Sequence, residues 1–412
     1  MRVLYFSPRI SWPTISGAHL RDYYFALTLA RHAELTYVGL VNEDPGDAAE
    51  KLRQRLEPQN GTKVYALRRQ AGYRPANILR GLVGPTPLNV LNYTSPQVIA
   101  ALDPILRQHN FDVVQIESMH LIAYARNIRR TFPNTRLILD WHNIESEILA
   151  RYAENDSNPL RAIYAKRTSA LSRNVENELL RLCDAHTVCS EREREVLVAR
   201  EPGARIEVVG NGVDCDFFRD DGSGDSESRR DVLFMGRMDY HANIDAAVHF
   251  VRTTWPLIRG RRPELRLVIV GANPSQAVQA LRSDNVVVTG TVDDVRPYYR
   301  SALASVVPLR VGGGTRLKVL EAMAAGTPVV SSTLGAEGLA VTDGNDILIA
   351  DSPESMANAV VSLQTGSPQW QNMIANARRL VRARYDWAVV GDILVRLHRE
   401  LVESDKACLK AR

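Results

Sequence analysis

The sequence predicts an α/β protein with two doubly wound parallel sheets. Short apolar runs alternate with longer helical patterns along almost the whole chain, which is typical of parallel strands joined by crossover helices. The chain has 412 residues, 45% hydrophobic and 24% charged, which is long for one core and suits two domains. A polar, glycine-bearing stretch from Arg219 to Arg230 lacks apolar periodicity and divides the strands into two sets.

The first set contains seven predicted strands and the second contains six. The first set is Val3–Ser7, Leu35–Val41, Lys63–Leu67, Phe111–Glu117, Arg136–Trp141, Ala185–Cys189 and Ile206–Val209. The second is Val232–Met235, Arg266–Val270, Val286–Thr289, Ala304–Pro308, Pro328–Ser331 and Ile347–Ala350. We therefore expect an N-terminal domain at 1–215, a linker at 216–230 and a C-terminal domain at 231–385. The helical pattern at 386–403 has no strand after it and could belong to either domain.

The positive charge of the chain is unevenly placed. The net charge is only +4, but residues 60–136 hold ten Lys and Arg against three Asp and Glu. None of the usual nucleic-acid-binding signatures accompanies this basic segment, so nucleic acid is not an expected partner. An anionic membrane surface or a phosphorylated acceptor fits better.

Cysteine usage and hydropathy limit the location and the cofactors. The four cysteines form no C-x-x-C pair and no metal-ligand spacing with histidine, which predicts a reduced, cytoplasmic protein that binds no metal. No stretch approaches the roughly 18 apolar residues of a spanning helix, so membrane contact would be peripheral, on the inner face of the plasma membrane. Because neither G-x-x-x-x-G-K-[ST] nor a strand followed by G-x-G-x-x-G occurs, a P-loop ATPase and a nicotinamide-dependent dehydrogenase are disfavoured.

The most informative segment runs from Val306 to Val330. It predicts a buried strand, a turn of three glycines (Gly312, Gly313 and Gly314), a helix and another strand. Glycines let the backbone approach a ligand closely, and the first amides of the helix favour an anion. The segment therefore predicts a site for a phosphate.

The two sides of this helix have different chemistry. Residues three and four apart share a face, so Thr315, Lys318 and Glu321 or Ala322 should line one side and meet ligand. The opposite side, Leu317, Leu320 and Ala324, should pack. Lys318 offers a cation, and Glu321 offers an acceptor for a pair of hydroxyls. Taken alone, the segment also fits an ordinary αβ unit with a surface Lys/Glu pair.

Three further residues follow predicted strands. Arg237 comes after Val232–Met235, where ligands bind in such sheets and where an arginine fork suits phosphate oxygens. His142 follows Arg136–Trp141 in the same way, and Gly17 lies in the turn after the first strand. The alternatives are a salt bridge at the rim for Arg237, a structural histidine, and a glycine that merely permits positive φ.

These pieces, in their order and spacing, resemble a known family. The matching pieces are the first strand with its Gly17 turn, Asp140-Trp141-His142-Asn143, Val188-Cys189-Ser190, Asn211-Gly212-Val213-Asp214, Phe234-Met235-Gly236-Arg237, Val268-Ile269-Val270-Gly271, and Val306–Val330. Together they resemble the retaining, nucleotide-sugar-dependent glycosyltransferases of family 4. The resemblance implies the GT-B arrangement, two facing Rossmann-like domains with an interdomain cleft, an N-terminal acceptor-binding domain and a C-terminal donor-binding domain.

The resemblance also implies roles for individual residues. Arg237 matches the arginine on the donor diphosphate, Glu321 the glutamate on the ribose hydroxyls, and His142 the histidine beside the donor sugar. Gly17 matches the loop that closes over the phosphates and acceptor. The final helix, 386–403, is expected to cross back to the first domain, and neither a metal nor a cofactor is implied.

The sequence departs from the family pattern at two positions. The family has a second glutamate eight positions before the one matched by Glu321, and that position holds Gly313. It also usually has a lysine about six residues after the arginine, where this chain has Asn243. Lys318 can supply the missing charge, and the amides of 312–314 can hold sugar hydroxyls or phosphate oxygens. Some family members with a G-G-G-T-R-L-K loop look like this.

The expected function is that of a retaining, metal-independent hexosyltransferase with His142, Arg237 and Lys318 as its catalytic residues. Its donor would be a UDP- or GDP-sugar bound by Gly17, Arg237, Gly312–Gly314, Thr315, Lys318 and Glu321. Its acceptor would be a hydroxyl of a saccharide or lipid-linked molecule, in cell-surface polysaccharide or glycolipid synthesis. A nucleotide-sugar-binding subunit without transfer activity and a sugar-nucleotide 2-epimerase are the alternatives.

The segment Arg68–Val83 mixes cations with apolar residues and could lie on anionic lipid. The alternative for this segment is a helix whose apolar side packs within the first domain.

Overall fold

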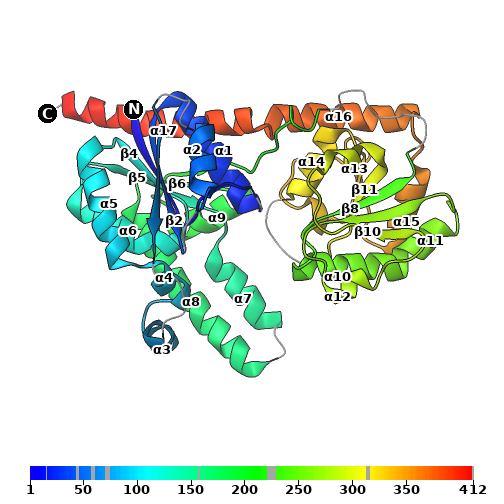
Figure 1. Ribbon diagram of the computed structural model, residues 1–412, viewed down its shortest axis with the longest axis horizontal. Helices are drawn as coiled ribbons and strands as arrows, with labels where there is room; N and C mark the ends of the chain where they lie inside the picture. Colours follow the sequence, from blue (N-terminus) through cyan, green and yellow to red (C-terminus); the bar gives the residue numbers. More distant parts are fainter. Residues whose placement is uncertain are drawn as a thin grey trace. The chain divides into compact units, whose positions relative to one another are not determined.

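The computed structural model describes residues 1–14, 16–42, 46–56, 61–69, 75–155, 158–219, 229–311 and 316–410. All thirteen predicted strands are confirmed, and they form two separate parallel sheets of seven and six strands (Figure 1). The inner strands are short, continuous runs of apolar and β-branched residues, which suits strands covered on both faces, whereas the edge strands Lys63–Arg68 and Leu348–Ile349 are less buried.

The first sheet has the order β3-β2-β1-β4-β5-β6-β7. Its strands are β1 (Arg2–Ser7), β2 (Glu34–Val41), β3 (Lys63–Arg68), β4 (Val113–Ile116), β5 (Arg136–Trp141), β6 (Ala185–Val188) and β7 (Ile206–Val208). Its helices are α1 (Gly17–His32), α2 (Ala48–Leu56), α3 (Pro75–Val83), α4 (Leu88–Tyr93), α5 (Pro96–His109), α6 (Ile122–Thr131), α7 (Glu145–Asn155), α8 (Pro159–Leu182) and α9 (Glu191–Arg200). The strand order reverses direction between β1 and β4, which is where doubly wound sheets bind ligands.

The second sheet has the order β10-β9-β8-β11-β12-β13. Its strands are β8 (Asp231–Met235), β9 (Arg266–Val270), β10 (Val286–Val288), β11 (Ala302–Val307), β12 (Val329–Ser331) and β13 (Leu348–Ile349). The helices that follow are α10 (His241–His249), α11 (Trp255–Arg259), α12 (Gln276–Gln279), α13 (Arg296–Ser301), α14 (Leu317–Ala325), α15 (Pro353–Ser362), α16 (Pro368–Arg384) and α17 (Trp387–Lys410). The reversal here lies between β8 and β11, next to Arg237.

The chain forms two compact units, each with its own hydrophobic core. Unit 1 comprises Met1–Gly210 and the residues from Gly391 onward, and unit 2 comprises Asn211–Val390. The first division therefore falls earlier than the boundary at 215 expected from the sequence. The physical reason is that Val213, Cys215 and Phe218 belong to the second core, and Val213 N–H donates to the Tyr385 carbonyl at 2.7 Å.

Helices of unit 1 shape both the carboxyl edge of its sheet and its outer surface. Ser16 caps α1 by accepting a hydrogen bond from His19 N–H, which starts that helix close after the carboxyl end of β1. Helices α7 and α8 pack against each other and project from the sheet, with α3 beside α8 (Figure 1). Within the described residues, no helix is long and apolar enough to span a membrane.

Candidate functional site

In unit 2, two glycines bring the backbone together at the carboxyl ends of β8 and β9. A Cβ on Gly271 would lie 1.6 Å from the Gly236 carbonyl oxygen, so only glycine fits there. Gly236 itself has φ of +156°, a conformation that other residues rarely adopt. This close crossing fixes the backbone from which the Arg237 side chain leaves the sheet.

Arg237 presents an exposed guanidinium at this edge. Its side chain is 52% exposed and pairs with Asp239, with Nη2 2.7 Å and Nε 3.1 Å from the carboxylate oxygens. An ion pair this exposed contributes little to stability, so an anionic ligand can replace Asp239 as the partner at low cost. Arg237 lies where the sequence predicted it.

Lys318 and Asn243 form a polar chain with the backbone of Arg237. Lys318 Nζ donates a hydrogen bond to Asn243 Oδ1 at 2.7 Å, and Asn243 Nδ2 donates to the Arg237 carbonyl at 2.8 Å. Nζ also lies 2.9 Å from the position that a Cβ on Gly236 would take. The ammonium group of Lys318 thus reaches the neighbourhood of the position where the family's usual lysine is replaced by Asn243.

The ionisation of Lys318 and Glu321 is shifted by their surroundings. Burial lowers the pKa of Lys318 to about 8; Arg316 adds to this effect and Glu321 opposes it. Burial raises the pKa of Glu321, although a hydrogen bond donated by Tyr299 OH at 2.9 Å and the charge of Lys318 both favour its ionised form. An incoming phosphate would favour the charged ammonium, because opposite charges stabilise each other.

Helix α14 confirms most of the predicted division of faces. Lys318 and Glu321 are partly exposed, whereas Leu320 and Ala324 are buried in the second core. Ala322, predicted as one of two choices for the ligand side, is fully buried instead. Ala322, Val319 and Met323 all belong to the second core, so the apolar arc of the helix is wider than predicted. Gly312, Gly313, Gly314 and Thr315 lie outside the described residues.

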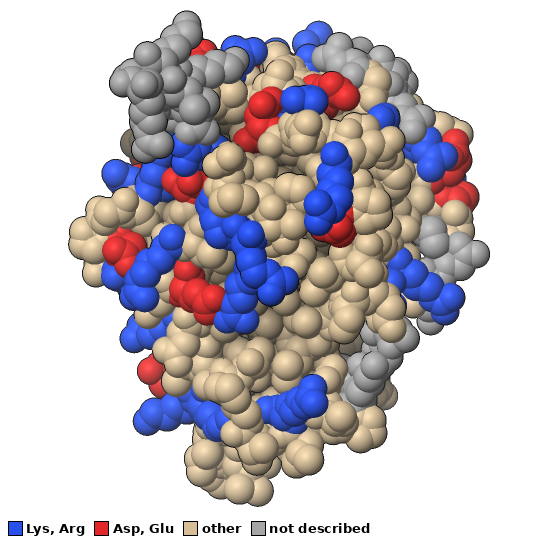
Figure 2. Space-filling model, turned by 90° about the vertical axis from the view of Figure 1, so that its left-hand side faces the viewer, with Lys and Arg blue, Asp and Glu red and all other residues tan. Residues whose placement is uncertain are grey.

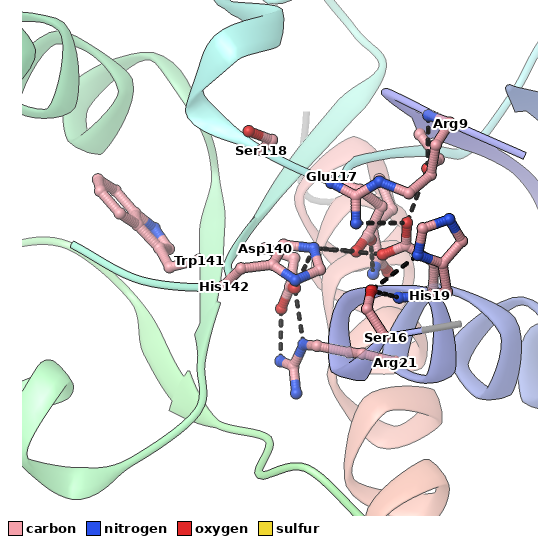
Figure 3. A network of polar contacts seen from close by, with 12 residues as sticks. Arg9, Ser16, His19, Arg21, Glu117, Ser118, Asp140, Trp141 and His142 are labelled. Carbon is pink, nitrogen blue, oxygen red and sulfur yellow. Dashed lines mark hydrogen bonds and ion pairs between the residues drawn. The ribbon is translucent and has the colours of Figure 1, made fainter. Parts of the chain in front are cut away.

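In unit 1, a buried salt bridge joins α1 to β5. Arg21 donates to Asp140 through Nε at 2.8 Å and Nη2 at 2.6 Å, and its Nη1 donates to the Gly210 carbonyl at 3.0 Å (Figure 3). Burial alone would raise the pKa of Asp140, but the charge of Arg21 outweighs this and lowers it. The bidentate pair fixes α1 against the carboxyl edge of the sheet.

His142 lies at the same edge and faces three carboxylates. Its Nε2 is 3.2 Å from Asp22 Oδ1 and 3.5 Å from both Glu117 Oε2 and Asp140 Oδ2. Figure 3 shows its ring turned toward this group, whereas Trp141 points away on the other side of the strand. The carboxylates come from α1 (Asp22), from the residue after β4 (Glu117) and from β5 (Asp140), so three elements meet at one imidazole.

This arrangement favours a protonated His142. Burial alone would lower its pKa, but Asp22 and Glu117, with help from Asp140, raise it to about 10. Burial and the charge of Asp140 raise the pKa of Glu117, which His142 partly offsets. At neutral pH His142 is therefore a cation, suited to stabilising negative charge or donating a hydrogen bond rather than accepting a proton.

Asp22, Glu117 and His142 are also the described residues that could hold a metal ion. Each offers one ligand atom, and these atoms lie within 4.8 Å of one another. The same three atoms lack hydrogen-bond partners among the described residues. A proton on His142 offsets part of the negative charge of these carboxylates, and a divalent cation would do the same. An experiment must therefore distinguish the two.

The sequence found only part of this arrangement. Of the predicted site residues, Lys318 and Glu321 share α14 in unit 2, and Lys318 is linked through Asn243 to the backbone of Arg237. Gly17 and His142 lie in unit 1. Sequence reasoning missed Arg21, Asp22 and Glu117. Two features of the sequence could have indicated them. Arg21 and Asp22 are adjacent opposite charges inside an otherwise apolar helical pattern, and Glu117 directly follows the apolar strand β4.

Comparison with family models places the chain. The model of glycosyl transferases group 1 matches residues 229–365, and that of glycosyltransferase family 4 matches residues 49–217. The two ranges together cover well over half of the chain. The chain belongs to the group 1, family 4 glycosyltransferases. The family resemblance found from the motifs is confirmed.

Curated relatives of this family match part of their length. The phosphatidyl-myo-inositol mannosyltransferase of Mycolicibacterium smegmatis is 30% identical over 199 residues, 46% of this chain and 50% of the relative. The D-inositol 3-phosphate glycosyltransferase of Acidothermus cellulolyticus is 30% identical over 197 residues, 42% of this chain and 44% of the relative. The chain thus spans about half the length of the curated relatives it matches.

Similar solved structures show the fold. Sucrose-phosphate synthase from Thermosynechococcus elongatus has a TM-score of 0.70 and 18% identity, covering 98% of this chain and 100% of that one. HepE from Anabaena, solved in complex with UDP, has a TM-score of 0.67 and 13% identity, covering 97% of this chain and 100% of that one. The predicted GT-B fold, with two Rossmann-like domains, is confirmed.

Proposed function

We propose that this chain is a retaining glycosyltransferase that moves a hexose from a UDP- or GDP-sugar to a hydroxyl of a saccharide or lipid-linked acceptor. The observation that carries the proposal is the cluster at the carboxyl edge of the second sheet. There Arg237 directly follows β8, Lys318 of α14 is linked through Asn243 to the backbone of Arg237, and Glu321 lies one turn further along α14, within a family of glycosyltransferases. Transfer would serve polysaccharide or glycolipid synthesis.

In this proposal the cations of unit 2 stabilise the departing diphosphate. The guanidinium of Arg237 binds phosphate oxygens in place of Asp239, and the ammonium of Lys318 lies beside the same backbone. Both act on negative charge that grows as the sugar leaves, so they lower the barrier more than they strengthen ground-state binding. Glu321, held by Tyr299, accepts hydrogen bonds from the ribose hydroxyls.

The amides of Gly312–Gly314, the side chain of Thr315 and the Gly17 turn complete the donor site in this proposal. They remain predictions from the family motif, with the glycine amides holding phosphate oxygens or sugar hydroxyls in place of the glutamate absent at 313. His142 serves beside the sugar as a cation, in agreement with its raised pKa. It therefore donates a hydrogen bond or stabilises charge instead of acting as a base.

Retention is proposed to proceed without a metal ion. The acceptor hydroxyl attacks the face that the diphosphate leaves, and its proton passes to a leaving phosphate oxygen. Arg237 and Lys318 supply the charge that a metal would otherwise supply. Unchanged turnover after chelation with EDTA would support this, and restoration of lost turnover by one divalent ion would contradict it.

The activities for which similar proteins are named support this substrate class. Relatives are named as mannosyltransferases and glycosyltransferases of inositol lipids or inositol phosphate, and HepE was solved with UDP. They support a nucleoside diphosphate donor and leave the choice between UDP and GDP to experiment.

The decisive experiment measures binding and chemistry separately. Thermal-shift titrations with UDP, GDP and ADP identify the base, because a ligand that binds the folded state raises its melting temperature. Release of nucleoside diphosphate from the corresponding sugar then tests for an enzyme. Arg237→Ala should abolish the shift, and Arg252→Ala, at an exposed site on another helix, should not.

Two results would overturn the proposal. Absence of a shift with every nucleotide would remove the donor site. A shift without release or transfer would favour a binding subunit, one of the two alternatives. A sugar-nucleotide epimerase would convert its donor to a new sugar nucleotide with no acceptor present, which chromatography of the products detects.

We further propose a cytoplasmic location with peripheral contact to an anionic membrane. Among the described residues, the buried cysteines Cys183 and Cys215 form no disulfide, which supports a reducing compartment. The basic segment at 60–136 supports contact with anionic lipid.

A further inference from the structure

Exposed apolar side chains gather at one place in unit 1. Of the thirteen large hydrophobic side chains that are exposed among the described residues, eight lie on α3, α7 and the first turns of α8. We call this group the apolar tip; its residues are Ile78, Leu79, Leu82, Val83, Ile148, Tyr152, Leu160 and Ile163. Single exposed apolar residues are ordinary, but a concentration of this kind marks an interaction surface.

The helices of the tip are held together by specific contacts. Arg167 of α8 donates to the Gly81 carbonyl at 2.8 Å and to the Gly84 carbonyl at 2.6 Å, which ties the end of α3 to α8. Helices α7 and α8 pack along each other and carry the tip away from the sheet (Figure 1). The tip is therefore a built surface of three helices.

Within each helix the exposed residues share a face. Leu79 and Val83 are four apart on α3, and Leu160 and Ile163 are three apart on α8, so each pair forms a short apolar strip. Val83 is 75% exposed and Leu160 is 77% exposed, which shows that no other described part of the chain covers them. The sequence-based alternative, that the apolar side of α3 packs within the first domain, is wrong for these residues.

The three helices of the tip carry an excess of positive charge. From Pro159 to Val175, α8 carries Arg161, Lys166, Arg167 and Arg173 and no Asp or Glu, and α3 carries Arg80 alone, whereas α7 carries Arg151 against Glu145, Glu147 and Glu154. Figure 2 shows basic side chains bordering the lower part of this face, where other residues fill most of the surface. Apolar residues next to cations, with few acids, are the combination that inserts into an anionic membrane surface.

This charge pattern indicates which kind of partner binds the apolar tip. A symmetric dimer that paired α8 of one copy with α8 of the other would set Arg161 and Lys166 against like charges. A bilayer with anionic headgroups instead neutralises the same cations while its acyl boundary takes the apolar side chains. Long Lys and Arg side chains can reach headgroups while the neighbouring apolar residues enter more deeply.

We propose that the apolar tip docks this protein on an anionic lipid bilayer. Leu79, Val83, Leu160 and Ile163 enter the headgroup and acyl boundary, and Arg80, Arg161 and Lys166 bind the headgroups. The proposal assigns a surface to the membrane contact that the proposed function includes. It rests on that function only for the purpose of docking, which is to bring unit 1 to a lipid-linked acceptor. Docking itself needs neither donor nor acceptor, so it can be measured separately.

The test is flotation of the full chain with vesicles. Wild-type protein should float with vesicles of phosphatidylcholine containing about 30 mol% phosphatidylglycerol as the experimental lipid, and much less with pure phosphatidylcholine. The variant Leu79→Ser/Val83→Ser/Leu160→Ser/Ile163→Ser should partition at least about tenfold less, because buried apolar area sets the affinity. Replacing Arg161 and Lys166 by Ser should weaken partitioning about fivefold per cation and remove most of its salt dependence.

Matched controls come from exposed positions in unit 2. Leu257→Ser removes an exposed apolar side chain on α11, and Arg384→Ser removes an exposed cation at the end of α16. Both should partition like wild type. Every variant should keep the wild-type melting temperature within a few degrees, because exposed side chains contribute little to stability.

Three outcomes would overturn the docking proposal: wild type that does not float with the anionic vesicles, a tip variant that floats equally well, or a dimer in solution that the tip substitutions dissociate. Nucleotide thermal shifts on the same samples distinguish the two proposals. Loss of flotation with an intact shift rejects docking alone, and flotation without any nucleotide shift rejects the donor site alone.

Discussion

At the scale of single residues, Lys318 shows how one position compensates for another. The family's usual lysine after Arg237 is replaced by Asn243, and Lys318 Nζ donates directly to the Asn243 side chain. The amide therefore serves as a bridge between the ammonium group and the Arg237 backbone. The structure thus holds the ammonium group of Lys318, from α14, beside the position where the resemblance expects a lysine.

Replacement of Lys318 by alanine should cripple transfer. Removal of one preorganised charge from a leaving diphosphate costs about a hundredfold or more in kcat. The measurement is steady-state release of nucleoside diphosphate. Lys51→Ala, an exposed lysine on α2, is the matched control and should keep wild-type turnover. Near-normal kcat/KM in Lys318→Ala would remove the assigned role.

His142 should make stability depend on pH in a defined direction. The folded protein raises its pKa from 6.5 to about 10, so between these values the folded state holds a proton that the unfolded state has lost. The stabilising contribution is complete below pH 6.5 and disappears as pH rises through 10. The loss of melting temperature in His142→Gln, relative to wild type, should therefore be largest near pH 6 and shrink toward pH 10.

A matched histidine provides the control for this prediction. His398 is buried in α17, and burial lowers its pKa to about 4, so it is already neutral across this range. His398→Gln should shift the melting temperature by an amount that does not vary between pH 8 and 10, because above pH 8 this histidine is neutral in the unfolded state as well. If the His142→Gln difference were equally constant, the imidazolium assignment would be wrong.

The sequence could predict the isolated members of the site and not its network. Arg237, Lys318 and Glu321 stand next to strand ends or on a recognisable helix, so local pattern identifies them. Asp22 and Glu117 can be recognised as part of this network only because the order of strands in the sheet places β1, β4 and β5 side by side. That adjacency is a property of the sheet, and no spacing along the chain encodes it.

At the scale of elements, strands were predictable and surface helices were not. Strands buried on both faces are continuous apolar runs, so they can be recognised directly in the amino-acid sequence. Helix α3 has a similar apolar content, but its apolar residues face outward. A helical pattern states which residues share a face and leaves open what that face contacts.

The close approach of the backbone after β8 to the backbone after β9 depends on glycine. Gly271→Ala should destabilise unit 2 by about 1–3 kcal/mol, because its methyl would overlap the Gly236 carbonyl and force the backbone apart. The same displacement should weaken nucleotide binding, since Arg237 follows Gly236. Denaturant unfolding and nucleotide thermal shift measure the two effects.

Gly203→Ala is the control for the glycine crossing. No atom lies within 4 Å of the Cβ that this alanine would add, so stability should stay within about 0.5 kcal/mol of wild type. Equal stability of Gly271→Ala and wild type would show that the strand ends can separate freely.

At the scale of the whole molecule, unit 1 needs both ends of the described chain. Gly391 of α17 lies so close to α1 that a Cβ would approach Thr28 Cγ2 at 2.7 Å. Arg396 pairs with Glu207 at 3.6 Å, and Leu394, Leu397 and Leu401 are buried. The last helix therefore contributes core to a unit whose other residues end at Gly210.

Truncation after Val390 should damage unit 1 more than unit 2. Loss of α17 beyond this point would expose apolar surface on α1 and the neighbouring strands, so unit 1 should aggregate or become sensitive to protease. Peptide mapping during limited proteolysis locates the early cuts. Early cuts within 1–210 are expected, and a protease-resistant unit 1 in the truncated chain would contradict this assignment.

The division at Gly210 and Val390 has a consequence for how the chain can be rearranged. Topologically, unit 2 is an insertion: one continuous stretch of sequence interrupts another unit and returns to it. The segments by which the chain enters and leaves unit 2 are hydrogen-bonded to each other, because Val213 N–H donates to the Tyr385 carbonyl and Trp387 N–H donates to the Val213 carbonyl. A related domain with the same paired ends could therefore be exchanged for unit 2 as a single segment, and unit 1 would keep its own two stretches of chain.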